Sequence, residues 1–157
     1  MNDSERATLR AVADYQFGRG AGTALFGGDD LTVRRTSSGR PQQVLADDGR
    51  LVSYGTDGRF TLGYAGGVRL AGALPADRYR VAVGEESAPY LREGRNAFAK
   101  FVRQADPAIR PADEVLVVDG EGDGNDLLAV GRAELSGEAM LDFDTGMAVK
   151  VREGAPE

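Results

Sequence analysis

Hydrophobic residues recur at helical spacing over the first stretch of the chain, "DSERATLRAVADYQF" (residues 3–17). The apolar positions that repeat are Leu9, Val12, Ala13 and Phe17. This spacing predicts an amphipathic helix, with Asp3 or Ser4 available to cap its first turn. The glycines of "GRGAG" follow at once, so we expect the helix to end there.

From Ala24 to Leu70 the pattern changes to short apolar segments separated by turns. The segments are "LTVRRT", "QQVLA", "RLVSYG", "RFTLGY" and "GVRLAG". Between them stand "DDG", "TDG" and "AGG", which are typical of hairpin turns. We therefore predict a helix packed on an antiparallel sheet, closed by "LPAD" (Leu74–Asp77). This divides the chain into two domains, residues 1–77 and 78–157.

The order of elements expected in the second domain predicts a small, nearly closed β-barrel with helical plugs. Its expected strands are "YRVAVG", "NAFAKFV", "DEVLVVDG", "LLAVGRAEL" and "GMAVKVREG". A short helix near "SAPYLREG" has Ser87 as its cap and Gly94 as its stop, and a second, "SGEAMLDF", has Ser136 as its cap. The loop "DPAIRPAD" precedes a hairpin that "EGDGND" joins. The fold class is therefore α+β.

Composition removes several kinds of active site. The chain of 157 residues contains neither cysteine nor histidine, so disulfides, thiolate metal sites and His-dependent nucleophiles are excluded. No acidic pair is placed by its spacing for acid–base catalysis. We therefore expect no catalytic residue, no metal ion and no cofactor. With no membrane-length apolar run and no signal peptide, we expect a cytoplasmic protein.

The charge pattern is uneven. The net charge is −6, and Lys100 and Lys150 are the only lysines among 19 basic residues. An acidic, lysine-poor chain suggests adaptation to a high-salt cytosol, although GC-rich codons would also favour arginine. Against this background, Tyr90–Arg110 carries five basic and two acidic residues, whereas residues 111–157 carry three basic and twelve acidic ones. The basic window is therefore a local exception.

The second half resembles the PUA domain, an RNA-binding pseudobarrel of RNA-modifying proteins. The segments that carry this resemblance are "EGRNAFAKFV", "DPAIRPADEVLVVD", "LLAVGRAELSGEAM" and "GMAVKVREG", in the family's order. The first half, through "DYQFGRGAGTALF" and "DGRFTLGYAGGVRLAG", resembles the small α/β domain that precedes PUA in archaeal tRNA-guanine transglycosylase and archaeosine synthase. The catalytic barrel and zinc site of that transglycosylase lie outside the matched region.

The resemblance implies that the first helix of the PUA domain, the glycine turn after it and the adjoining strands face RNA. The residues expected there are Arg92, Gly94, Arg95, Asn96, Lys100, Arg110, Lys150 and Arg152. Glycine allows close backbone approach, and arginine forks fit phosphates. On the strand "NAFAKFV", alternation places Phe98, Lys100 and Val102 on one face. Tyr90 could stack a base.

Plainer alternatives stay open for these residues. The cations could form a solvated face, and Lys150 and Arg152 could protect an edge strand. Arg132 is expected to be structural. Arg110 could equally be a surface loop residue.

The function expected from the sequence is non-catalytic RNA binding. The resemblance implies tRNA, recognised by shape, and a link to tRNA modification. Two alternatives remain: an RNA-binding accessory subunit of a split tRNA-modifying enzyme, or a protein-interaction module. An enzyme is the least favoured reading, and no membrane partner is expected.

Overall fold

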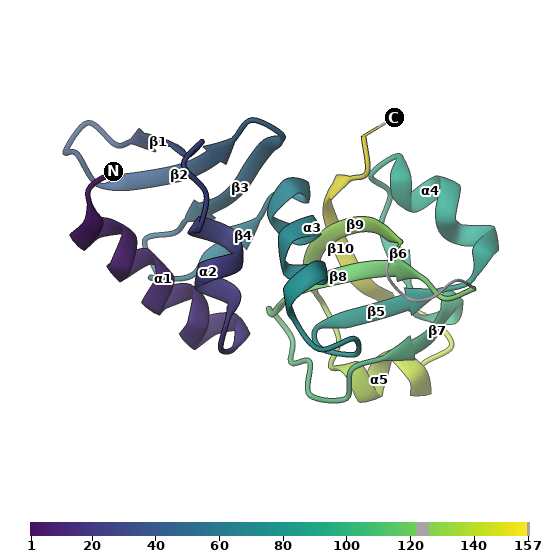
Figure 1. Cartoon of the computed structure of the whole chain (residues 1–157). Helices are drawn as coiled ribbons and strands as arrows, with labels where there is room; N and C mark the ends of the chain where they lie inside the picture. Colours follow the sequence, from purple (N-terminus) through teal and green to yellow (C-terminus); the bar gives the residue numbers. More distant parts are fainter. Residues whose placement is uncertain (122–125, 157) are drawn as a thin grey trace. The chain divides into compact units, whose positions relative to one another are not determined.

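The computed structural model describes residues 1–121 and 126–156. The chain divides into two compact units, Met1–Leu74 and Pro75–Glu157, and each is described by itself (Figure 1). None of the described helices is both long enough and apolar enough to cross a membrane.

The first unit is a four-stranded antiparallel sheet with helices, in the strand order β1-β2-β3-β4. The strands are β1 (Thr32–Arg35), β2 (Pro41–Ala46), β3 (Gly49–Tyr54) and β4 (Phe60–Leu62). The helices are α1 (Asp3–Phe17), α2 (Ala21–Phe26) and α3 (Tyr64–Ala73). Gln16 fixes α1 to β4, because its side-chain amide bonds both the N–H and the carbonyl of Phe60. Helix on antiparallel sheet is the architecture that the sequence predicts.

Three local predictions for this unit were wrong. The cap of α1 is neither Asp3 nor Ser4 but Asn2, whose Oδ1 accepts the Glu5 N–H at 2.8 Å. Helix α2 was not expected. The segment "GVRLAG" forms most of α3 instead of a strand. Gly66 explains the last case, because a Cβ there would collide with the Leu51 carbonyl; the glycine lets α3 lie directly against β3.

The second unit is a six-stranded sheet in the order β6-β10-β9-β8-β5-β7, curled into a nearly closed barrel (Figure 1). Its strands are β5 (Arg80–Val83), β6 (Ala97–Phe98), β7 (Val102–Ala105), β8 (Glu114–Asp119), β9 (Leu127–Ala133) and β10 (Met147–Gly154). The helices are α4 (Ala88–Arg92) and α5 (Gly137–Asp142), with 3-10 turns η1 (Glu85–Ser87) and η2 (Ala99–Phe101). Strands β5 and β8 are parallel, and the other pairs are antiparallel. The barrel prediction is confirmed.

The barrel encloses an aliphatic core. Val81, Val83, Val115 and Val117 alternate inward from β5 and β8, and Met140 of α5 joins them. The hairpin of β8 and β9 is confirmed, although residues 122–125 of its predicted connection lie outside the described residues.

The segment "NAFAKFV" departs from its prediction. It is not one strand, because η2 separates β6 from β7 and so connects the two edges of the sheet. Phe98 and Lys100 are both exposed, but Val102, expected on the same face, is only 8 % exposed and joins the core. The turn interrupts the two-residue alternation on which that prediction rested.

The two predicted serine caps differ. Ser136 Oγ accepts the Ala139 N–H at 3.1 Å, as expected at the start of α5. Ser87 occupies the N-cap position of α4, but within the described residues its hydroxyl makes no capping hydrogen bond.

Candidate nucleic-acid interface

The end of α4 forms a glycine turn with an open surface. Gly94 has φ +90°, its N–H bonds the Leu91 carbonyl at 2.9 Å, and the Arg95 N–H bonds the Tyr90 carbonyl at 3.0 Å. This is the Schellman arrangement, in which a glycine takes the left-handed conformation just past the helix. No described atom lies within 4 Å of the place that a Cβ on Gly94 would take. Backbone here is therefore accessible to a ligand.

A cavity of about 150 Å³ lies beside this turn. Its walls come from α4, the turn, β6 and η2, and they include Tyr90, Arg95, Asn96, Phe98 and Phe101. The Arg95 guanidinium stands 5.6 Å from the centre of the Tyr90 ring. Tyr90 and Phe98 are 53 % and 43 % exposed. Exposed aromatic rings beside an arginine provide faces on which a nucleobase can stack.

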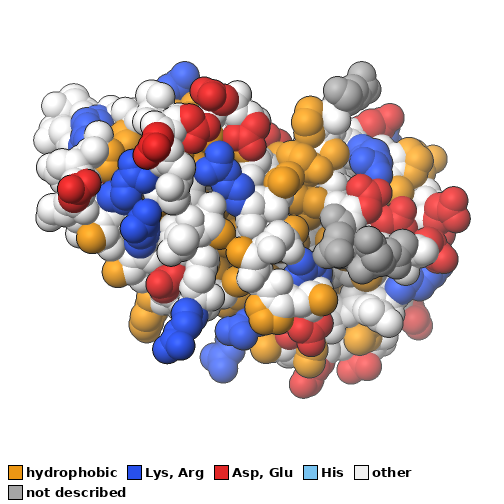
Figure 2. All heavy atoms as spheres, viewed as in Figure 1, with side chains coloured by type: hydrophobic (Ala, Val, Ile, Leu, Met, Phe, Trp, Pro, Cys, Tyr) orange, Lys and Arg blue, Asp and Glu red, His pale blue; other side chains and the backbone are white. Residues whose placement is uncertain are grey.

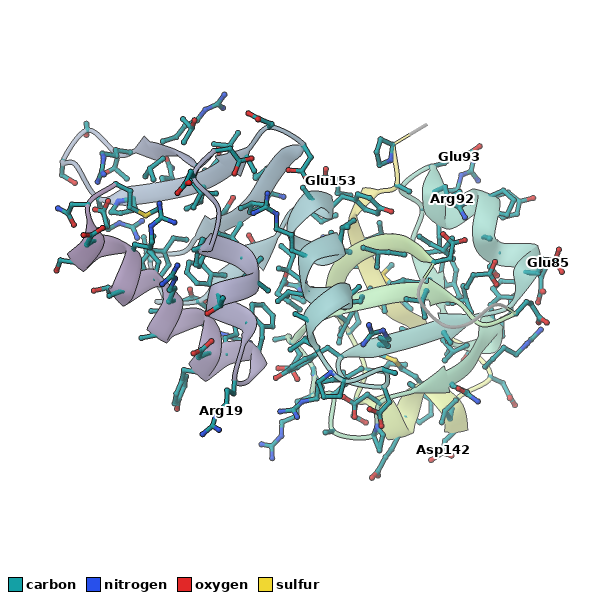
Figure 3. All side chains as sticks on the ribbon, in the orientation of Figure 1. Arg19, Glu85, Arg92, Glu93, Asp142 and Glu153 are labelled. Atoms are coloured by element: carbon teal, nitrogen blue, oxygen red, sulfur yellow. The ribbon has the colours of Figure 1, made fainter. Side chains whose placement is uncertain are left out.

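The arginines at this end of α4 are paired with carboxylates in solvent. Arg92 donates to Asp126 at 2.6 Å, and Arg95 Nε lies 3.6 Å from Glu93. Figure 3 shows Arg92 and Glu93 at the same end of α4, and Figure 2 shows red side chains interspersed among the blue ones there. Exposed pairs of this kind contribute little to stability, so a phosphate can replace the carboxylate with little loss.

Asn96 and Lys100 both lie near the cavity but differ in their contacts. Asn96 Oδ1 accepts the Val151 N–H at 2.9 Å and so holds the turn on β10. Lys100 is exposed on η2, with its Nζ 5.0 Å from the centre of the Phe101 ring that lines the cavity. Asn96 therefore has a structural bond that the sequence did not indicate, and Lys100 lies close to the cavity rim.

Lys150 and Arg152 lie on β10, beside a second hollow of about 250 Å³ that Arg132, Lys150, Val151 and Arg152 line. Lys150 pairs in register with Arg132 of β9. Arg152 makes two hydrogen bonds, of 2.6 and 2.9 Å, to the two oxygens of the buried Glu114. Neither Arg132 nor Glu114 was expected here, because cross-strand register cannot be read from one sequence.

Arg110 lines neither of these two cavities. It is exposed in the loop between β7 and β8, where its backbone N–H bonds Asp113 Oδ2 at 2.9 Å. The candidate residues thus fall into three groups. Arg92, Gly94, Arg95, Asn96 and Lys100 lie around the end of α4, which we call the helix end; Lys150 and Arg152 lie on β10; and Arg110 lies in this loop.

A larger groove of the second unit, of about 690 Å³, is less suited to an anion. Asp77 and Asp106 line it. Arg103 lies there too but donates to Glu86 at 2.6 Å. Burial lowers the pKa of Arg80, which also lines it. Among the described residues no group of three carboxylates could hold a metal ion.

The two units match two different domain families. The family described as the patch-forming domain C2 of tRNA-guanine transglycosylase matches residues 7–77, and the PUA domain family matches residues 79–155. The second half of the chain is a PUA domain. The first half is a C2 domain of the transglycosylase type.

Relatives with both domains are named tRNA-guanine(15) transglycosylase. The chain is 45 % identical to the Pyrococcus furiosus protein over 150 residues, which are 95 % of this chain and 25 % of that protein. It is 43 % identical to the Methanothermobacter thermautotrophicus protein over 155 residues, which are 98 % and 23 % of the two chains. The chain therefore spans about a quarter of the length of these relatives.

Solved structures share the fold. A hypothetical protein from Pyrococcus horikoshii superposes with a TM-score of 0.74 at 22 % identity, over all of this chain and 93 % of that one. A conserved PUA domain protein from Thermoplasma acidophilum does so with a TM-score of 0.64 at 20 % identity, with the same coverage. At this identity the likeness supports the fold of the C2 and PUA domains.

Proposed function

We propose that the chain is a non-catalytic RNA-binding protein that recognises tRNA through its PUA domain. The observation that carries this proposal is the aromatic cavity beside Gly94, with Arg95 in its wall and Arg92 at the end of the adjoining helix α4. Phosphates would replace the carboxylates now paired with these arginines, and a base would stack at Tyr90 or Phe98. Contacts to phosphates and 2′-hydroxyls read the shape of RNA more than its sequence.

A second candidate is an RNA-binding subunit that acts with a catalytic partner. The observation in its favour is that the chain matches only about a quarter of relatives named as transglycosylases. In that case the chain would supply tRNA binding to an enzyme that modifies tRNA. Use of the same fold for protein contacts is the remaining alternative.

The test is binding of purified protein to bulk tRNA and to duplex DNA across a salt series. The acidic, lysine-poor composition supports a high-salt cytoplasm as the setting, so the series extends to molar salt. The variant Arg92→Ala/Arg95→Ala should weaken tRNA binding and lower the salt slope by about one for each lost phosphate contact. Arg103→Ala is the control, because Arg103 is also exposed and paired with a carboxylate.

Preference for tRNA over DNA, lost in the double variant and kept in the control, would support the proposal. Folded wild-type protein that binds no RNA at any salt would refute stand-alone RNA binding. Copurification of a catalytic chain would then favour the subunit.

A further inference from the structure

We propose that Arg132, Lys150 and Arg152 form a binding site for a phosphodiester of the RNA backbone, and that Glu114 is its positioning residue. This inference rests on the proposed function and deepens it. The PUA resemblance already implies that Lys150 and Arg152 face RNA, and the new elements are Arg132 as a further contact and Glu114 as the residue that directs Arg152. We call these residues the strand row, because they lie on β8, β9 and β10.

The sheet register brings the row together. Glu114 of β8 stands opposite Arg132 of β9, and Arg132 stands opposite Lys150 of β10. Directly opposed residues of neighbouring strands have their Cβ atoms about 5 Å apart. Two cations and one carboxylate, from three distant parts of the sequence, thus occupy one line across the sheet.

A β-bulge adds Arg152 to this line. Val151 pairs with Gly131 and Glu153 with Val130, so Arg152 is the extra residue of β10. A bulge changes the direction of its side chain, and the Arg152 guanidinium here lies on both oxygens of Glu114, at 2.6 and 2.9 Å. Asn96 supports the bulge by accepting the Val151 N–H.

Glu114 is the most buried member of the row, at 4 % exposure. Two parallel hydrogen bonds fix a guanidinium in plane and direction, and a buried carboxylate has no freedom to release it to solvent. The Arg152 side chain is itself 29 % exposed, so part of it still faces water. Glu114 therefore sets the direction of Arg152 without covering it.

The hollow beside the row has the charge that a phosphate needs. Among the described residues, Arg132, Lys150, Val151 and Arg152 line it, and no carboxylate does. Lys150 is exposed and forms no salt bridge with any described residue. Arg132 pairs with Glu134 at 3.1 Å, in an exposed pair that a phosphate can exchange.

Protection of a sheet edge concerns only Lys150 and Arg152, which lie beyond the Met147 and Val149 that pair with β6. It does not explain Arg132, which lies on a strand paired on both sides, with Glu114 of β8 and Lys150 of β10. Binding of an anion explains why three cations gather around one hollow.

The decisive variant is Glu114→Gln, because its charge effect and its positioning effect have opposite signs. Removing a negative charge from the protein strengthens binding to RNA through long-range electrostatics. Loss of the paired oxygens frees Arg152 and weakens binding. We expect weaker tRNA binding, by about three- to tenfold, because Arg152 keeps its charge but loses its fixed direction.

The matched control is Glu134→Gln, which makes the same charge change beside Arg132. We expect it to leave tRNA binding unchanged or to strengthen it. Lys150→Ala should weaken binding to all tRNAs alike and lower the salt slope by about one. If Glu114→Gln does not fold, Arg152→Lys takes its place, because lysine keeps the charge but cannot make two parallel bonds; it should weaken binding similarly.

Two results would overturn the inference while tRNA binding itself persists. A positioning role for Glu114 is excluded if the Glu114→Gln or the Arg152→Lys variant binds tRNA as tightly as the wild type does. Unchanged affinity and salt slope in Lys150→Ala exclude the row as a phosphate site.

Titration of inorganic phosphate, followed by amide NMR, separates this site from the proposed function. We expect shifts at the backbone amides of Lys150, Val151 and Arg152 in wild type, reduced in Lys150→Ala. If these shifts occur but tRNA does not bind, the row is an anion site and the proposed function is wrong. If neither phosphate nor tRNA affects these amides, the inference is wrong, and the proposed function is wrong as well if tRNA also fails to bind.

Discussion

At the end of α4, Arg92 and Arg95 stand in solvent beside exposed carboxylates, whereas on β10 the guanidinium of Arg152 is held by the buried carboxylate of Glu114. The two regions offer similar charges to an anion but hold them differently. Exposed pairs contribute about 0–1 kcal/mol each. Removing one partner of a buried pair costs about 3–5 kcal/mol, since a charge is left without its partner.

This difference distinguishes adjustable contacts, which can follow a ligand, from preset contacts, whose geometry the fold already fixes. Arg92 can exchange Asp126 for a phosphate at little cost, so the helix end can follow the ligand. Arg152 cannot change direction without breaking two hydrogen bonds to Glu114. The helix end is therefore expected to adapt to RNA, and the strand row to present a fixed geometry.

The largest effect is expected from Arg152→Ala, which breaks the preset pair. It leaves Glu114 buried without its bidentate partner, and we expect the PUA domain to lose about 2–4 kcal/mol, below the full buried-pair value because Arg152 is partly exposed. Urea unfolding followed by circular dichroism measures the loss. Arg103→Ala, which breaks an exposed pair, is the control. A loss no greater than that of the control would remove the distinction between the two regions.

The next effect is expected at Gly154, where the two regions meet. A Cβ on Gly154 would collide with the Arg92 carbonyl and lie 2.7 Å from the Leu91 carbonyl. Gly154→Ala should therefore push the end of α4 away from β10 and destabilise the PUA domain by about 1–3 kcal/mol. Unfolding and tRNA binding are both measured, and both should weaken.

Gly72→Ala is the control for Gly154→Ala. No described atom lies within 4 Å of its would-be Cβ, and it lies within α3, where alanine is the better helix former. If Gly154→Ala changes neither the stability of the PUA domain nor tRNA binding, the two regions are not linked through this contact.

Backbone conformation gives a third, smaller contrast. Gly94 has φ +90° beside the helix end, while Ala112, just before Glu114, has φ +78° although it carries a Cβ. We expect Gly94→Ala to destabilise the domain by about 1 kcal/mol and Ala112→Gly to stabilise it by about 0.5–1 kcal/mol. Thermal unfolding of both variants measures the pair. If both substitutions change the stability in the same direction, neighbouring contacts outweigh backbone strain at one of the two positions.

The sequence predicted those parts of the fold that periodicity encodes. Leu9, Ala13 and Phe17 marked α1, the continuous apolar run in "EVLVV" marked β8, and the apolar residues around Lys150 in "MAVKV" marked β10. It failed where contacts decide the outcome. The segment "GVRLAG" became helical because glycine allows α3 to lie against the backbone of β3, and η2 interrupted a segment with the alternation of a strand.

The same distinction between local pattern and long-range contact applies to the candidate site. Gly94 was predictable, because a glycine after a short helix indicates a left-handed turn. Lys150 was noticed because lysine is rare in this chain. Arg132 was expected to be structural and Glu114 was not singled out, since the neighbours of each depend on register with a strand far along the sequence. Asn96 was assigned to RNA, although its side chain accepts the N–H of Val151, which is 55 residues away and which no local pattern indicates as a partner.

The smallest stability effect is expected from Arg92→Ala, and it tests the adjustable half of the comparison. Loss of an exposed pair with Asp126 should change the free energy of unfolding by less than about 1 kcal/mol. The same variant should weaken tRNA binding and lower the salt slope by about one, because the lost charge would contact a phosphate. A stability loss near that of Arg152→Ala would show that Arg92 is fixed in the fold. Unchanged tRNA affinity beside a folded, tRNA-binding wild type would mean that the helix end does not meet RNA, and the strand row would then carry recognition without it.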